Sequence, residues 1–201
     1  MQRKPFNVDL APFRDDLDLK YAAKHKEESN ICLIGDVWTD HWRNGRIIHG
    51  PGFYQGNNIF TTEGRNQILD IVFGSTSVDA TIYMGIFTNN VTPAAADTAS
   101  AKLGASGDYG EGQDADYDDP ETNRPEYTVA AASSSSVTNS ASKAEFTIAQ
   151  SITVYGAFLA SAQAKTATSG VLYCAKAFSS SRAVIDDDAL AITYAISMTS
   201  S

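Results

Sequence analysis

Alternation of large and small side chains near the end of the sequence constrains the fold more than any other feature. Between residues 189 and 198 the large side chains occupy every second position, at Leu190, Ile192, Tyr194, Ile196 and Met198. Successive side chains of a β-strand point to opposite faces, so this pattern predicts a half-buried strand with one large and one small face. Residues 171–178 alternate in the same way. The end of the chain is therefore expected to pack as β-sheet.

Further candidate strands lie at residues 80–87, 126–132, 143–149 and 152–159. The segment 152–159 is apolar on both sides, which is typical of a central strand. Six or more strands separated by turn residues predict a sandwich or barrel, and one helix among them gives no βαβ repeat. The expected fold class is mainly β, a β-sandwich or jelly-roll-like domain with one short helix and an extended N-terminal arm.

The short helix is predicted at about residues 63–73. Thr61 or Thr62 can cap its N-terminus, and Gly74 stands where a left-handed C-terminal cap belongs. An apolar stripe runs along it, made of Ile68, Leu69, Val72 and Phe73.

Residues 1–57 are expected to form the arm, and residues 58–201 the β-sandwich domain. Proline and glycine interrupt the arm, and no periodic pattern holds in it for long. Isolated aromatic side chains along such a segment cannot bury one another, so they must dock on other residues. They either wrap around the chain's own sandwich or insert into a neighbouring protein. The partner-interface candidates are Phe6, Phe13, Tyr21, Trp38, His41, Trp42, Phe53 and Tyr54.

The net charge of −9 is unevenly distributed along the 201 residues. Residues 1–60 hold eight Lys and Arg against eight Asp and Glu, whereas residues 61–201 hold seven against sixteen. An acidic body repels phosphate, which argues against nucleic-acid binding. Cys32 and Cys174 are too sparse for a disulfide framework, which favours free thiols in a reducing cytoplasm. No apolar run is long enough for a signal peptide or a membrane span.

Candidate metal sites are incomplete. The acids of residues 114–119 alternate as in a calcium loop, but Asp119 and Pro125 stand where an EF-hand needs Gly and Glu. The spacing of His25, His41, His49 and Cys32 matches no ordinary zinc pattern. Residues 114–119 are therefore expected to form a solvated acidic loop, and the histidines and Cys32 are expected to make partner contacts.

Candidate catalytic motifs are incomplete as well. Residues 50–56 carry one residue too many for a dinucleotide-binding loop, and residues 104–108 miss the G-x-S-x-G pattern by one position. The carboxylates of Asp15–Asp16 and of residues 186–188 have no pocket signal around them. The chain is therefore expected not to be an enzyme and to need no cofactor.

Two stretches are of low complexity. Residues 104–125 are rich in Gly, Asp and Tyr, and Ser133–Ser136 joins two candidate strands. In isolation both are expected to be mobile.

Residues 58–73 followed by residues 83–87 resemble a block found in virion structural proteins of tailed bacteriophages. That block consists of a capped helix, then a strand of a small β-domain, then a loop punctuated by Pro and acidic residues. Residues 152–160, residues 170–176 and the terminal strand continue the resemblance, which covers about residues 58–200. It implies a β-sandwich fold, symmetric oligomers and no enzyme activity.

Proteins of this kind occur as capsid decoration (cement) proteins and as parts of tail fibres or baseplates. We therefore expect a capsid decoration protein that binds the major capsid protein, or another virion protein, through its N-terminal arm. It would be assembled in the host cytoplasm, reside in the virion and form a homo-oligomer, with a trimer favoured, without binding nucleic acid or membrane. A tail fibre, neck or baseplate component is the alternative within virions. A carbohydrate-binding or glycan-active β-domain is the alternative of another class, with exposed Tyr and Trp side chains, Trp38 and Trp42 among them, as stacking platforms.

Overall fold

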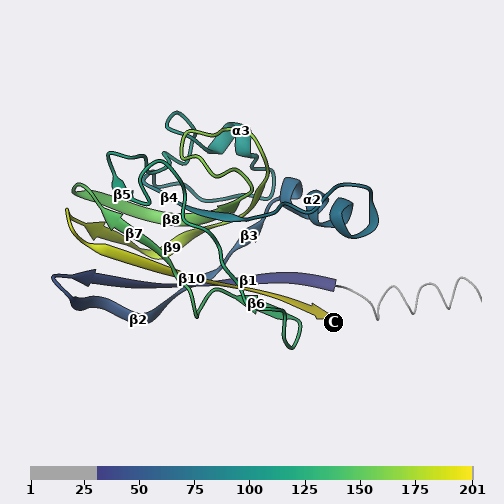
Figure 1. Cartoon of the computed structure of the whole chain (residues 1–201), viewed down its shortest axis with the longest axis horizontal. Coiled ribbons are helices and arrows are strands. Elements are labelled where there is room, and N and C mark those ends of the chain that lie inside the picture. The colour runs from purple at the N-terminus through teal and green to yellow at the C-terminus, as the bar shows by residue number, and fades with distance from the viewer. Residues whose placement is uncertain (1–30, 201) are drawn as a thin grey trace, which may run out of the picture. The chain divides into compact units, whose positions relative to one another are not determined.

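Two antiparallel β-sheets pack across a hydrophobic core in the computed structural model, which describes residues 31–200 (Figure 1). Residues Leu33–Ser197 form a compact unit, to which the following description applies. The predicted β-sandwich, with mainly β structure, is confirmed.

The larger sheet has six strands in the order β2-β1-β10-β7-β5, with β6 also paired to β10. Its strands are β1 (Ile31–Arg43), β2 (Arg46–Asn57), β5 (Tyr117–Asp119), β6 (Ser136–Thr138), β7 (Ala144–Ile148) and β10 (Ala189–Ser200). The smaller sheet has four strands in the order β3-β9-β8-β4. These are β3 (Ile59–Phe60), β4 (Tyr83–Phe87), β8 (Ile152–Ala160) and β9 (Leu172–Val184). Two helices complete the described residues: α2 (Thr62–Phe73) and α3 (Ala99–Lys102).

The core forms where the large faces of the strands meet. Leu190, Ile192 and Tyr194 of β10 are fully buried, as the alternation predicts. Leu190 pairs with Phe146 of β7, and from the other sheet Met84 of β4 joins the same cluster. β8 lies between β4 and β9, which confirms its prediction as a central strand.

The predicted extent of the helix is confirmed, whereas the predicted left-handed cap at Gly74 is wrong. Thr61 is the N-cap, and its hydroxyl accepts a 2.9 Å hydrogen bond from the backbone N–H of Gly64. Gly74 has a φ of −96°, which is extended backbone rather than the predicted left-handed cap. Its N–H donates to the carbonyl of Asp70, so the last turn closes without a left-handed residue. A second, four-residue helix, α3, was not predicted.

Residues 31–57 differ from the expected extended arm, because they form the hairpin of β1 and β2 at one edge of the six-stranded sheet. Asn44 and Gly45 make its tight turn, with positive φ angles of 51° and 72°. Asn-Gly is a strong hairpin signal, since both turn positions require positive φ. Register shifts between Val37 and Trp38, and again around His41, break the period of two that would have marked β1 as a strand. Residues 1–30 lie outside the described residues, with the candidates Phe6, Phe13 and Tyr21 and the possible ligand His25.

Residues 126–132 do not form the predicted strand. Only Glu126 makes a bridge, to Tyr83, and the segment otherwise runs as irregular chain beside β4. The Ser-rich stretch is a tight turn, in which the backbones of Ser133 and Ser136 bond to each other. Ser134 and Ser135 take positive φ angles at its tip.

A buried ion pair orders much of the loop at 104–125. Arg124 and Glu111 are both fully buried and lie 2.6 Å apart between Nε and Oε1. Arg124 also donates to the carbonyls of Ala162 and Ala167, in the connection between β8 and β9. The mobility expected for this loop in isolation is therefore opposed by contacts that its composition does not reveal.

Candidate functional site

The first turn of α2 is fixed to the four-stranded sheet. The Glu63 carboxylate accepts hydrogen bonds of 2.9 Å from the backbone N–H groups of Ala99 and Leu172. Gly64 lies directly on β9, where an added Cβ would come within 2.4 Å of the Tyr173 carbonyl oxygen. This close approach requires glycine and sets the position of the helix.

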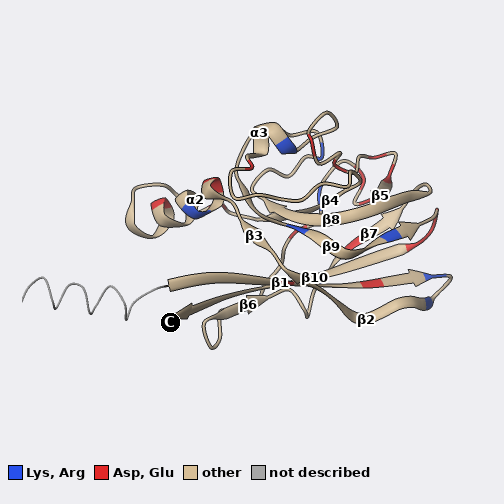
Figure 2. Ribbon diagram, turned by 180° about the vertical axis from the view of Figure 1, so that it is seen from behind, with Lys and Arg blue, Asp and Glu red and all other residues tan. Residues whose placement is uncertain are grey.

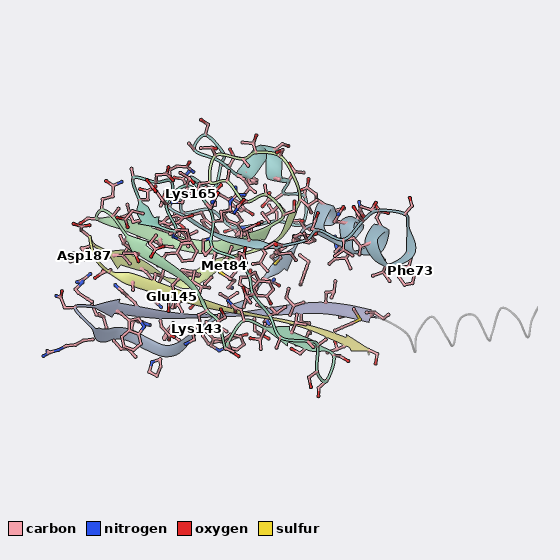
Figure 3. The ribbon with its side chains drawn as sticks, in the orientation of Figure 1. Phe73, Met84, Lys143, Glu145, Lys165 and Asp187 are labelled. Atoms are coloured by element: carbon pink, nitrogen blue, oxygen red, sulfur yellow. The ribbon has the colours of Figure 1, made fainter. Side chains whose placement is uncertain are left out.

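The rest of α2 presents apolar side chains to solvent. Leu69, Val72 and Phe73 are 54%, 61% and 83% exposed, and Val78 after the helix is also exposed. Only Ile68 of the predicted stripe packs against the core. Figure 3 shows Phe73 at the far end of α2. We call Leu69, Val72 and Phe73 the α2 apolar patch.

A hollow of about 520 Å³ lies on the outer face of the six-stranded sheet. Its lining residues come from β1, β2, β6, β10 and the segment that precedes β7: Trp38, Gly52, Ser136, Thr138, Ser140, Lys143, Thr193 and Ala195. Thr193 and Ala195 alternate along β10 with the buried Ile192 and Tyr194, so they point away from the core. We call this the outer-sheet hollow.

The Trp38 ring forms one wall of the outer-sheet hollow, and the Tyr54 ring lies beside it. Trp38 of β1 is opposite Tyr54 of β2 in the strand register, and their ring centroids are 5.5 Å apart. The Tyr54 hydroxyl donates a 2.7 Å hydrogen bond to Asp36, which fixes the ring. The hydrogen bond to Asp36, and to a smaller extent desolvation, raises the pKa of Tyr54.

Lys143, which lines the hollow, forms an ion pair with Asp40 of β1. The Lys143 ammonium contacts Asp40, a carboxylate that also accepts from the backbone N–H of Gly52. Asp40 is buried, whereas Lys143, labelled in Figure 3, is about one-third exposed. The pair brings compensating charges to the rim.

The remaining hairpin candidates have different surroundings. His41 is buried, and its Nε2 lies 2.8 Å from Asp188. Trp42 is 37% exposed and is not part of the hollow's lining. Phe53 is partly exposed and lies 4.1 Å from the His49 ring and 4.8 Å from the Arg182 guanidinium. The structure thus brings Trp38 and Tyr54 together and places His41 in the interior.

Asp188 is the centre of a buried polar cluster. Arg43 donates two hydrogen bonds to it, of 2.8 and 2.7 Å, and the backbone N–H of Ile185 donates a third. Burial raises the pKa of the Asp188 carboxyl, but hydrogen bonds from Arg43, Ile185 and His41 outweigh burial and hold the pKa well below its usual range. A carboxylate held ionised by these donors fits a structural role.

Arg182 is buried beside this hairpin. Its Nε and Nη2 atoms have no hydrogen-bond partner within residues 31–200, and burial lowers its pKa. Its guanidinium stacks on Phe53 instead.

The acidic loop uses its carboxylates within the chain. Asp116 accepts 2.8 Å hydrogen bonds from the Gln113 backbone and the Gln150 side chain. Asp114 lies 3.2 Å from the ammonium of Lys165, which also donates to the carbonyl of Tyr117. Figure 2 shows acidic residues on the loops around β5. Across residues 31–200 no three His, Cys, Asp or Glu side chains gather as metal ligands would.

Sequence reasoning identified the aromatic wall of the hollow but missed its floor and rim. Thr193 and Ala195 were recognised only as the small face of a strand. Of the hydroxyl-bearing lining residues, Ser136 belongs to the Ser-rich stretch predicted to join two strands, and Thr138 and Ser140 lie outside every predicted element. These residues come together because β6 and β7 both pair with β10, and no local sequence pattern predicts that pairing.

No protein-family model, curated protein or solved structure matches this chain. No helix among residues 31–200 is both long and apolar enough to cross a membrane.

Proposed function

We propose that this chain is a non-enzymatic structural protein of a tailed-bacteriophage virion, most directly a capsid decoration (cement) protein bound to the major capsid shell. The observation that supports it is the α2 apolar patch. Its side chains project from a helix whose first turn is fixed to the sheet through Glu63 and Gly64. A rigidly held apolar surface is suited to permanent burial against another protein.

The α2 apolar patch can supply part of the binding energy of a stable contact. Burying a large apolar side chain contributes about 1.5–3 kcal/mol, so the exposed parts of Leu69, Val72 and Phe73 represent about 3–6 kcal/mol of binding energy. The costs of association reduce this figure, and further contacts must add to it. Residues 1–30, the remainder of the predicted arm, are the proposed source of those contacts.

The acidic balance of residues 61–201 supports a protein partner over nucleic acid, because like charges repel phosphate. The resemblance of residues 58–200 to virion proteins supports the particular setting. We propose in addition that the chain forms a symmetric homo-oligomer, with a trimer favoured. Sedimentation velocity on the purified chain measures the copy number directly, and a monomer at every concentration would contradict it.

The test locates the chain on purified particles of the virus that encodes it. Mass spectrometry should detect it in stoichiometric amounts, and cryo-electron microscopy should place it on the capsid lattice. Density on the tail, neck or baseplate would replace the decoration role with the tail alternative. Absence from the particles would overturn the proposal altogether.

A variant pair tests the patch itself. Leu69→Ser with Phe73→Ser should reduce occupancy on particles by about tenfold or more while the melting temperature stays unchanged, since both side chains are exposed. Val129→Ser removes a partly exposed apolar side chain outside α2 and should leave occupancy intact. Equal occupancy of the two variants would show that the α2 apolar patch is not the contact.

Deleting residues 1–30 tests the arm separately. A deletion to residue 57 would instead remove β1 and β2, which are part of the sheet. The shorter deletion should leave the sandwich folded and weaken attachment. Full attachment after this deletion would end the arm proposal.

A further inference from the structure

We propose that the outer-sheet hollow is a carbohydrate-binding site that takes an uncharged pyranose ring stacked on Trp38. This activity goes beyond a structural role in a particle and depends on different residues. It assigns a ligand class to a surface on the face of the six-stranded sheet turned away from the core.

The first argument is the aromatic platform. Val37 and Thr39 are buried, so Trp38 between them points to the outer face. Trp38 is only partly buried, and Tyr54, its partner across the strands, supports it from the side at 5.5 Å between ring centroids. A pyranose ring is amphipathic, with C–H bonds on its faces and hydroxyl groups at its edge. Its apolar face therefore gains from removing the indole surface from water.

The second argument is the room beside this platform. Thr193 and Ala195 are the small face of β10, so the floor of the hollow has little side-chain volume. Gly52 adds none, and even an added Cβ there would meet no atom within 4 Å. The volume of about 520 Å³ falls within the range of about 300–1,000 Å³ that is usual for small-molecule sites.

The third argument is the chemistry of the rim. The rim and floor carry hydroxyl groups from Ser136, Thr138, Ser140 and Thr193, which can both donate and accept hydrogen bonds. Thr138 accepts from the Ser140 backbone at 3.2 Å, so its hydroxyl hydrogen can be donated to a ligand. Sugar hydroxyls have the same dual capacity.

The charges on the rim favour an uncharged sugar. Lys143 is the one charged residue of the lining, and Asp40 neutralises it by direct contact. Lys143 can donate to sugar hydroxyls, and the buried Asp40 cancels the net charge that would attract an anionic group. This distinguishes the hollow from sites for phosphate or sialic acid, which need unpaired cations.

The experiment measures binding of the full chain to an array of neutral and acidic glycans, followed by titration calorimetry with the bound sugar. We expect a neutral glycan to bind. Trp38→Ala should weaken its binding by about tenfold or more, as removal of a central aromatic contact does. Trp42→Ala is the matched control, because Trp42 is an indole on the same strand but outside the hollow, and this variant should bind as the parent chain does.

A second variant tests the site independently, in case Trp38→Ala loses binding only because it does not fold. Ala195→Leu keeps the aromatic wall and fills the floor, so it should abolish binding while circular dichroism and melting temperature stay close to those of the parent. The Trp42→Phe chain retains Trp38 as its sole tryptophan, and sugar binding should change its fluorescence. Absence of any neutral-glycan binding, binding to acidic glycans alone, or unchanged binding in Ala195→Leu would each overturn the proposal.

Failure of this test does not affect the virion proposal. Particle occupancy depends on Leu69 and Phe73 of α2, whereas glycan binding depends on Trp38 and Ala195 of the larger sheet. The two pairs of variants therefore report on the two proposals separately.

Discussion

Replacement of Arg124 by Met should lower the free energy of unfolding by about 3–5 kcal/mol, because it leaves a buried carboxylate without its cation. Arg124 and Glu111 have fully buried side chains joined by two hydrogen bonds, of 2.6 and 2.8 Å. Methionine approximates the length of the arginine stem, so little of the cost comes from a cavity. Most comes from Glu111 and from the carbonyls of Ala162 and Ala167, which lose their donor.

The cost should depend on pH, with a sign that follows from the pKa of Glu111. Burial raises this pKa, and the hydrogen bonds and charge of Arg124 act to lower it, so the variant should raise it further. A carboxyl group with a higher pKa folded than unfolded opposes folding progressively as pH rises above its unfolded value, about 4.3. The difference between variant and parent should therefore be larger at pH 8 than at pH 5.

Urea unfolding, followed by circular dichroism at both pH values, measures the effect. Lys102→Met is the control and should cost about 1 kcal/mol or less, because its 2.8 Å partner Asp108 is exposed and Asp97, 3.4 Å away, keeps hydrogen bonds from Ala94 and Tyr109. Combining Arg124→Met with Glu111→Gln should recover much of the loss, since no buried charge remains. An Arg124→Met cost no greater than that of Lys102→Met, or the same at both pH values, would refute this reasoning.

Three further predictions concern the core, the thiols and the acidic loop. Ile192→Ala should destabilise the protein by about 2–5 kcal/mol in denaturant unfolding, through lost burial and a cavity at a fully buried position, and a change below about 0.5 kcal/mol would contradict its place in the core. Native protein at pH 8 should react rapidly with a thiol reagent at the exposed Cys32 and not at Cys174, because burial raises the pKa of the Cys174 thiol to about 12. Two fast-reacting thiols in the absence of denaturant would contradict this prediction. Millimolar calcium should leave the melting temperature unchanged, since Asp116 is engaged by amide donors and Asp114 by Lys165, whereas a rise of several degrees would show calcium bound to the folded state.

Sequence patterns predicted the elements that have a regular alternation of residues along a strand or a local capping signal. β10 and β7 each place one face in the core, so the alternation of large with small residues in β10 and of apolar with polar residues in β7 identified both strands. α2 was predictable from Thr61, because the capping hydrogen bond joins it to Gly64, only three residues along the chain. Such elements carry their own signal because neighbours along the chain determine them.

The β1–β2 hairpin escaped prediction because its inner face is polar. Thr39, His41 and Gln55 are buried there and bond to one another or to distant partners, as Gln55 does to Thr39 and His41 to Asp188. Binary patterning expects apolar residues at such positions. The Asn44–Gly45 turn was the local evidence for the hairpin.

The apolar stripe of α2 shows what a pattern leaves open. An amphipathic helix indicates that its apolar face needs cover, without identifying which surface provides it. Here Ile68 faces the core, whereas Leu69, Val72 and Phe73 face solvent. The anchor at Gly64 decides this, because close contact with Tyr173 fixes the first turn and thereby the direction of the helix.

The outer-sheet hollow follows from the same alternation that predicts β10. A strand with large residues on its core face and small residues on its outer face leaves a shallow floor outside, formed by Thr193 and Ala195. Whether that floor becomes a site depends on the strands that flank it. β1 contributes Trp38 from more than a hundred residues away, and β7 is preceded by Lys143. The sequence predicts the floor of the hollow but not the residues that surround it. Trp38 and Trp42 look alike in the sequence, and only the fold shows that Trp38, and not Trp42, lies beside the small face of β10.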